Sequence, residues 1–210
     1  ITGLISGIVA GAVATIFHFI MVHPLILEAE KYEISSSVVT KSEKPSRTHT
    51  HEPQLTGNGI MRGTFTFIAN LIVGIAFGIL LATGLTLYGR PIGWIEGIGW
   101  GTAGFLAFSL LPALGLPPEV PGSATAELFP RQVWWLSTAF ASVMGIALIA
   151  FNSQFLWKAV GLTALIVPHV IGAPKPPTNA VGSVPPELAA HFVVNTLFFT
   201  ATMWIILGIT

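Results

Sequence analysis

The sequence contains no cysteine, and only 9% of its 210 residues are charged. Without cysteine the chain has no disulfide, no thiol nucleophile and no thiolate ligand, so histidine and carboxylate remain as possible metal ligands. Aspartate is absent as well, and all nine acidic residues are glutamates. Soluble domains carry charge on about a quarter of their residues. A charged fraction this low, together with 52% hydrophobic residues, indicates an integral membrane protein.

The chain also lacks the short motifs of three common enzyme classes. It has no H-E-x-x-H of metalloproteases, no G-x-S-x-G of serine hydrolases and no G-x-x-x-x-G-K-[ST] loop of nucleotide-driven pumps. Its net charge is zero, so no basic surface for nucleic acid is indicated. We therefore expect a protein that is not an enzyme, holds no tightly bound cofactor and binds no nucleic acid.

Six long stretches of the chain are free of charged residues. A helix needs roughly 20 apolar residues to cross the hydrocarbon, and all but one of the stretches reach that length. The exception, the fifth in order, contains Gly161 and Pro168, so we expect a span with little tilt or a helix that crosses incompletely. No segment alternates apolar and polar residues as barrel strands would. The stretches are residues 1–27, 63–89, 97–118, 132–157, 159–174 and 188–210.

This pattern predicts an all-α integral membrane protein, a polytopic helical bundle of about six transmembrane helices, with five as the alternative. The whole chain, residues 1–210, is expected to form a single membrane domain. Its one sizeable polar insertion, residues 28–59, is rich in Ser, Thr, Lys and Glu and poor in large apolar side chains. Such a composition cannot bury a core, so we expect a flexible polar loop between the first two spans.

Glycines recur at every fourth position in three of the predicted helices. Small residues at this spacing lie on one helix face and let backbones approach closely in a membrane. We therefore expect tight packing along these faces, against each other or against a partner. Asn70 and Asn195 are expected to hydrogen-bond between helices. The glycine sets are Gly3, Gly7 and Gly11; Gly74 and Gly78; and Gly93, Gly97 and Gly101.

Threading six spans through a bilayer places all six histidines and eight of the nine glutamates on one side, the His/Glu-rich side. Glu96 is the exception, and the opposite side carries only Arg90 and Lys158 as basic residues. The seven Lys and Arg of the His/Glu-rich side would place it in the cytoplasm, but they are interspersed with glutamates, so the orientation stays open. A one-sided set of imidazoles and carboxylates indicates a surface that gathers cations.

Two Pro/Gly-rich helix ends on the His/Glu-rich side are similar. Residues 112–119 end the third stretch and residues 168–174 end the fifth, and each is followed by a helix that opens with Glu-Leu, at Glu127 and at Glu187. Pro and Gly are common where membrane helices end, but the similarity also indicates a possible repeated two-helix hairpin. Transporters often place their binding site where repeats meet. Arg131 follows Glu127 by four residues, which predicts a helical salt bridge.

Glu187 and His191 are well spaced for binding a metal. They are four residues apart, so on a helix they project from one face about one turn apart. Glu187 has a second explanation, because a carboxylate after two prolines is also favoured by the dipole at a helix start. His169 lies in an apolar stretch, where an ionisable side chain usually faces a bundle interior or a water-filled cavity.

Further candidate ligands lie near the ends of the first and third stretches. His23 is expected at the membrane interface with Glu28 one turn beyond, and Glu119 follows the third stretch. His49 and His51 in the polar loop either attract a metal weakly or are solvated polar residues. The predicted metal ligands are Glu187, His191, His169, Glu119, His23 and Glu28.

Five motifs occur in order along essentially the whole chain: PLILEAEKYE (24–33), LPALGLPPEVPG (111–122), RQVWW (131–135), VPHVIGAP (167–174) and VPPELAAHF (184–192). Together they resemble the predicted cobalt transporter subunit family CbtA. The resemblance implies a multi-pass protein of the prokaryotic inner (cytoplasmic) membrane that imports Co²⁺ for cobalamin synthesis. It also implies a partner, often CbtB, a small single-span protein with histidines.

We interpret the chain as a membrane subunit of a transition-metal uptake system, with Co²⁺ or Ni²⁺ as the transported ion, because imidazole suits both. Glu187, His191, His169 and Glu119 are expected to pass the ion from the His/Glu-rich side into the bundle. The alternative is a non-transporting structural subunit of a larger membrane complex, whose polar residues orient helices. Ligation of a cofactor or pigment by a membrane histidine is a third possibility, for which the sequence fixes no partner. In each case the chain contacts the lipid bilayer.

Overall fold

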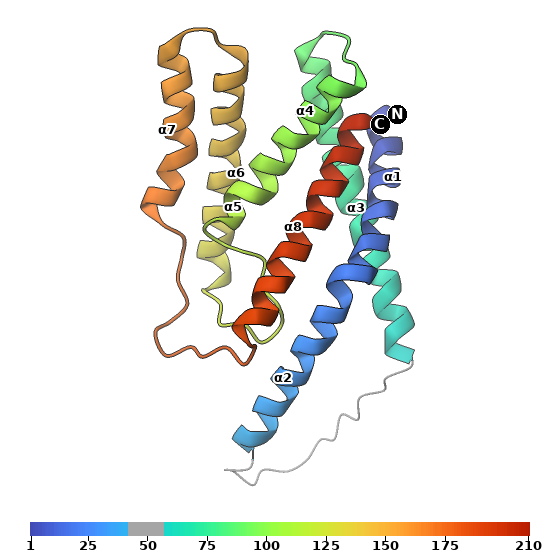
Figure 1. The fold of residues 1–210 in the computed structure, drawn as a ribbon, viewed down its shortest axis with the longest axis vertical. Helices are drawn as coiled ribbons and strands as arrows, with labels where there is room; N and C mark the ends of the chain where they lie inside the picture. Colours follow the sequence, from blue (N-terminus) through green and yellow to red (C-terminus); the bar gives the residue numbers. More distant parts are fainter. Residues whose placement is uncertain (42–56) are drawn as a thin grey trace.

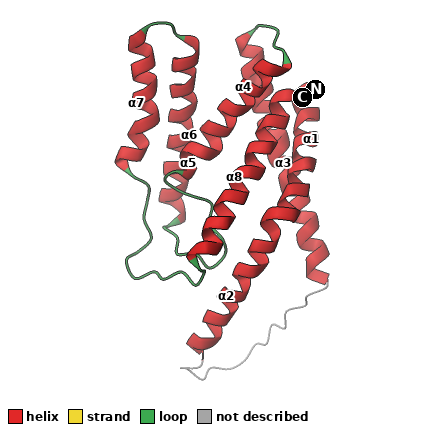
Figure 2. Cartoon of the chain, viewed as in Figure 1, coloured by secondary structure: helices red, strands yellow, loops and turns green. Residues whose placement is uncertain are grey.

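The computed structural model describes residues 1–41 and 57–210, in which the chain forms helices and loops with no strand (Figure 2). Its helices join into six segments in these residues, because two pairs of α-helices are continuous through a π-helical turn. This confirms the predicted all-helical bundle. The elements are α1 (Thr2–Phe17), η1 (His18–Val22), α2 (His23–Lys41), α3 (Gly57–Tyr88), α4 (Trp94–Phe105), η2 (Leu106–Leu110), α5 (Leu111–Ala113), α6 (Leu128–Phe151), α7 (Phe155–Ile171) and α8 (Pro186–Ile209).

Four helices in the described residues are long and apolar enough to cross a membrane: the continuous helix from Thr2, α3, α6 and α8. α7 is apolar but shorter, as Gly161 and Pro168 indicated. The outside of the bundle is covered by large apolar side chains; Leu87 is 83% exposed and Phe140 69% exposed. Such a surface, on helices of this length, is typical of contact with lipid. The chain is therefore a multi-pass membrane protein.

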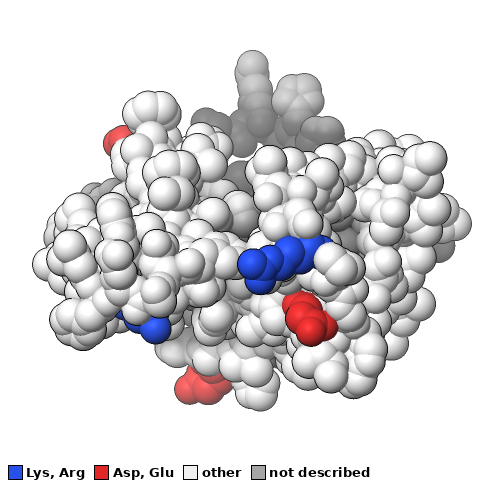
Figure 3. Space-filling view, turned by 90° about the horizontal axis from the view of Figure 1, so that it is seen from above, with Lys and Arg blue, Asp and Glu red and all other residues white. Residues whose placement is uncertain are grey.

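Both chain ends lie together at one end of the bundle (Figure 1). The short turns between α3 and α4 and between α6 and α7 lie at this end too, whereas α3, α6 and α8 begin at the opposite end (Figure 1). This is the arrangement that six spans predict, with the His/Glu-rich side at the end where α8 begins. On the opposite face, seen in Figure 3, charged side chains are few and scattered over an uncharged surface.

The first helix extends well beyond the end predicted for it. α1, η1 and α2 form one helix through Lys41, so the loop predicted for residues 28–59 does not begin at Glu28. Arg62 of α3 donates from both terminal nitrogens to Glu30 of α2, at 3.1 and 2.8 Å. This bidentate ion pair joins the extension to the start of α3. Residues 42–56, which include His49 and His51, lie outside the described residues.

The tightest helix contacts are made between glycines, as their spacing predicted. A Cβ atom added to Gly7 of α1 would lie 2.5 Å from the Cα of Ile75 on α3, and Gly3 and Gly11 face α3 in the same way. On α4, Gly97 and Gly101 pack against the backbone of α8. Gly93 takes no part, because it is the N-cap of α4 and lies beside the Glu96 carboxylate.

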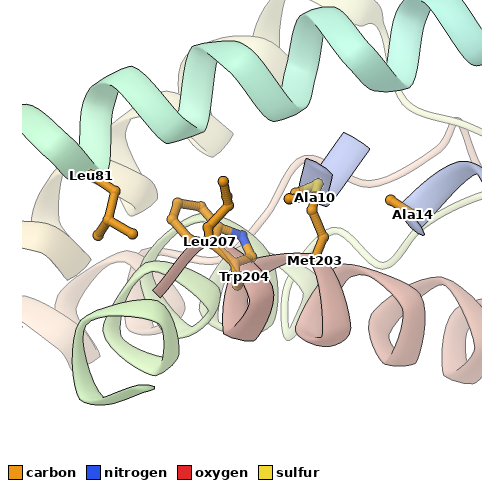
Figure 4. Packing of buried hydrophobic residues seen from close by; sticks show 6 residues of the cluster. All are labelled: Ala10, Ala14, Leu81, Met203, Trp204 and Leu207. Atoms are coloured by element: carbon orange, nitrogen blue, oxygen red, sulfur yellow. The ribbon is translucent and has the colours of Figure 1, made fainter. Parts of the chain in front are cut away.

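A compact apolar cluster fills the space between α1, α3 and α8 (Figure 4). Its largest member is Trp204, which is 1% exposed and lies over Gly104 of α4. The indole is stacked on the ring of Phe108 at 5.7 Å. Trp204 therefore packs α8 against the C-terminal half of α4. The buried members of the cluster are Ala10, Ala14, Leu81, Met203, Trp204 and Leu207.

Two partly buried asparagines connect helices, as predicted from their position in apolar stretches. Asn70 of α3 donates to the hydroxyl of Thr15 on α1 at 3.2 Å. Asn195 of α8 donates to the carbonyl of Met21, in the π-helical turn η1, at 3.1 Å. Hydrogen bonds of this kind contribute about 0.6 kcal/mol each in membrane proteins.

Substituting Gly7 with alanine should destabilise the bundle by about 1–3 kcal/mol, because α1 and α3 must move apart to admit the methyl group. Gly99→Ala is the matched control, since a Cβ there would meet no atom within 4 Å. The free energy of unfolding of the two variants is measured in mixed detergent micelles and compared with that of the unmodified protein. Equal stability of the two variants would contradict the observed α1–α3 contact.

Candidate functional site

A pocket of about 750 Å³ opens on the His/Glu-rich side between the α5 turn, α6 and α8. Its walls combine apolar side chains such as Phe108 and Trp135 with an unusual number of polar ones for a membrane bundle. Of these, Thr196 and Thr200 are four residues apart on α8 and thus share a face, a signal that sequence analysis could have used. The polar lining residues are Ser109, Glu119, Arg131, Gln132, Thr196 and Thr200.

An ion pair between Glu119 and Arg131 occupies one wall of the pocket. Glu119 is held by the rigid Pro117-Pro118 segment, and Arg131 lies in the first turns of α6. The two side chains are 23% and 28% exposed, so water reaches the pair only partly. Partial burial strengthens the attraction relative to a surface pair.

Two polar atoms of pocket-lining residues lack hydrogen-bond partners within the described chain: the Nε of Arg131 and the Oγ1 of Thr196. Both atoms are buried. Most buried polar groups are hydrogen-bonded, so these two atoms are exceptions among the described residues. A volume of 750 Å³ is large enough for many waters, each of about 30 Å³, or for a hydrated ion.

The predicted salt bridge between Glu127 and Arg131 is wrong. Glu127 is the N-cap of α6 with an extended backbone (ψ 143°), and its side chain is exposed. The four-residue spacing brings two side chains together only when both residues are helical. Arg131 instead pairs with Glu119, twelve residues earlier in the chain.

The two similar Pro/Gly segments contact each other. Gly115, in the turn after α5, packs against the Trp134 ring and lies next to Ala173, which follows α7. Farther along, the backbone N–H of Ser183 donates to the carbonyl of Gly122 at 3.0 Å. The loops between α5 and α6 and between α7 and α8 therefore form one continuous layer across this end of the bundle.

His169 lies below this layer, half-buried against α6. Its ring meets Trp134 edge to face, with the ring centroids 5.9 Å apart. Trp134 donates its indole N–H to the carbonyl of Pro168 at 3.3 Å. The Nε2 atom of His169 is buried and has no hydrogen-bond partner among the described residues. The prediction that His169 faces the protein interior agrees with this packing.

Glu187 and His191 lie on the first turns of α8, and both side chains are exposed. His191 precedes the pocket-lining Thr196 by five residues, which corresponds to a rotation of roughly 140° about the helix axis. The two candidate ligands therefore point away from the pocket. His169 is on α7, which packs against α6 and has no substantial interface with α8. His169 and His191 therefore do not share a site in the described chain.

The remaining predicted ligands are separated as well. His23 is half-buried at the start of α2 and packs edge to face on Phe19, with the centroids 5.4 Å apart, whereas Glu28 is exposed. Over residues 1–41 and 57–210, no three His or Glu side chains are grouped closely enough to hold a metal ion. The six predicted ligands thus remain individual candidates, and only Glu119 lines the polar pocket.

A family model for probable cobalt transporter subunits, CbtA, matches residues 1–210. The chain belongs to this family. No curated protein and no solved structure matches it. The family is named for transport rather than for catalysis, in agreement with the absence of enzymatic motifs from the sequence.

Replacing Arg131 with methionine should lower the free energy of unfolding by about 1–3 kcal/mol, because it leaves the Glu119 carboxylate partly buried without its charged partner. Glu127→Gln should change the stability by less than about 0.5 kcal/mol, since this exposed side chain makes no ion pair in the described chain. Thermal or denaturant unfolding of the purified protein measures the difference. If Glu127→Gln lowered the free energy of unfolding more than Arg131→Met does, Arg131 would pair with Glu127 instead.

Proposed function

We propose that this chain forms the membrane pathway of a cobalt uptake system, and that the pocket containing Glu119 is the ion-binding station within it. One observation carries the proposal: a polar pocket with a carboxylate and hydroxyl groups inside an otherwise apolar bundle. Ionisable groups at such positions in membrane proteins typically mark ion pathways. The family's association with cobalt supports Co²⁺ as the cargo.

The pocket can hold a hydrated divalent ion through oxygen ligands. Glu119 supplies the negative charge, and Ser109, Gln132 and Thr200 supply neutral oxygens around it. Such a set favours loose binding of an ion that keeps several waters, whereas imidazole and thiolate ligands hold transition metals more tightly. Loose binding is what transport needs, because the ion must leave the site as readily as it enters.

Arg131 regulates access to the carboxylate in this mechanism. Its guanidinium neutralises the Glu119 carboxylate, so the pair brings no net charge into the membrane. An arriving cation competes with Arg131 for the carboxylate, and the arginine side chain must move aside before the ion binds. The exchange keeps the charge of Glu119 compensated throughout, which avoids the large cost of an isolated buried charge.

The histidines and glutamates of the His/Glu-rich side would act earlier, as the surface that gathers the ion. Glu187 and His191 are exposed at the start of α8, beside the layer of loops that covers the bundle end. In this proposal the chain lies in a prokaryotic inner membrane and works with a small single-span subunit such as CbtB. The competing proposal is a structural subunit of a larger complex, which the glycine faces would also serve.

Glu119→Gln should reduce ⁵⁷Co uptake by a factor of about 10–100, the range typical for loss of a group that supports a metal site. Arg131→Gln should preserve uptake within a few fold, because the carboxylate is then free for the ion. The double variant Glu119→Gln/Arg131→Gln has no unpaired charge and should reach normal protein levels while uptake stays low. Uptake is measured in cells without other cobalt importers, with the protein level matched by immunoblot.

His191→Ala serves as the comparison within the same assay, and we expect a smaller loss than for Glu119→Gln because His191 points away from the pocket. Normal ⁵⁷Co uptake by the Glu119→Gln/Arg131→Gln variant would rule out the pocket as the ion-binding site of the pathway. If the unmodified protein shows no cobalt-dependent uptake even with a single-span partner present, the structural-subunit alternative holds.

A further inference from the structure

A second hollow, an apolar groove of about 670 Å³, lies between α3, α4 and α6. α3 and α6 have no substantial interface with each other, so α4 forms the floor between them. The floor consists of small residues, Gly99, Ala103 and Ala107, and the walls carry aliphatic side chains such as Leu80 and Ile146. In a membrane, a groove of this composition must be filled by something apolar.

The groove runs from the membrane surface to the middle of the bundle. Its outer end is marked by Tyr88, Trp100 and Phe151, whose rings contact one another with centroids 5.6–5.9 Å apart. Its inner end is closed by the stacked rings of Phe108 and Trp204. From Glu96 on α4 to Phe108 in η2 the continuous helix rises roughly 18 Å along its axis. This is close to half of the hydrocarbon core, which is about 30 Å thick, so the groove spans a single leaflet.

Arg90, a cation that forms no ion pair within the described residues, lies at the outer end of the groove. The Arg90 guanidinium lies 5.8 Å from the centre of the Tyr88 ring, which itself lines the groove. The ion pairs in the described chain join Arg62 to Glu30 and Arg131 to Glu119, so neither involves Arg90. Among the described residues that line the groove, the carboxylate is Glu96, which accepts the backbone N–H of Gly93 at 2.9 Å at the start of α4. Its charge is thereby engaged by the helix N-terminus.

From this geometry we infer that the groove binds one acyl chain of an anionic phospholipid, with the phosphate on Arg90. The apolar groove has the length of one leaflet, and arginine is well suited to binding phosphate oxygens in pairs. A transmembrane helix is a poorer fit, because a cylinder about 10 Å wide and 30 Å long occupies on the order of 2,400 Å³. The inference is independent of cobalt transport and of the Glu119 pocket.

Gly99→Leu tests the groove directly. A Cβ at Gly99 meets no atom within 4 Å, so the leucine can fill the groove without disturbing α4. Gly59→Leu is the matched control, because Gly59 also has open space around it and lies on α3 outside the groove. The probe is phosphatidylglycerol with brominated acyl chains added to the full chain in detergent. Bromine quenches tryptophan fluorescence, and Trp100 and Trp204 line the groove.

We expect saturable quenching of the unmodified protein and of Gly59→Leu, and at least a tenfold weaker affinity for Gly99→Leu. Equal affinities of Gly99→Leu and the unmodified protein would overturn the proposal. If Gly99→Leu does not fold, the proposal is tested by competition for the brominated probe on the unmodified protein. Unbrominated lysophosphatidylglycerol, which has one acyl chain, should displace the probe, whereas glycerol phosphate should not. Displacement of the probe by glycerol phosphate but not by lysophosphatidylglycerol would also overturn the proposal.

The headgroup is tested with Arg90→Gln and with brominated phosphatidylcholine as the zwitterionic probe. The preference for phosphatidylglycerol over phosphatidylcholine should fall about fivefold in Arg90→Gln, the effect of one basic residue near the membrane surface. Lys158→Gln, which removes the other cation of this side, should leave the preference unchanged. An undiminished preference in Arg90→Gln contradicts the proposed phosphate contact. Disulfide cross-linking of Gly99→Cys between two copies would identify a second copy as the occupant instead.

Discussion

Backbone contact between glycines is the constraint on which the rest of this structure depends. Helices in lipid gain little from burying apolar side chains, since lipid is equally apolar, and they associate instead through close packing. Here α1 meets α3 at Gly7 and Gly74, and α4 meets α8 at Gly97 and Gly208. At these points no room remains for a single methyl group. The positions of α3 and α4 relative to the central pair α1 and α8 are therefore fixed by four small residues.

The placement of α4 determines where the two hollows lie. α4 is held against α8 at Gly97, Gly101 and Gly104, and the helix then continues through the π-helical turn η2 towards α6. On one side of this path lies the apolar groove, and beyond its end lies the polar pocket. Phe108 lines both, and its ring is stacked on Trp204. This aromatic pair separates a lipid-like environment from a water-accessible one within a single bundle.

Local signals in the sequence predicted much of the fold. The length of the uncharged stretches gave the helical class and the topology, the four-residue spacing gave the glycine faces, and Asn70 and Asn195 were recognised as interhelical donors. Features that depend on distant parts of the chain were missed. Arg131 could not be assigned to Glu119, because that pairing requires the α5–α6 loop to fold back over α6. The exposed position of His191 depends on the rotation of α8 about its axis, which its partners set. The continuation of α2 past Glu28 is supported by packing against Val120 and Leu188, which composition does not reveal.

The Glu119–Arg131 pair has an energetic consequence for any ion that uses the pocket. A free carboxylate in this position would bind a divalent cation more strongly than one on the protein surface, because it is only partly exposed to solvent. The guanidinium lowers the net affinity, since the energy of breaking the existing pair is subtracted from the energy of binding the ion. The result is a site whose affinity is set by the difference between two electrostatic interactions, and small movements of the α5–α6 loop change that difference. A carboxylate already paired with an arginine thus suits a passage for ions better than a place of storage.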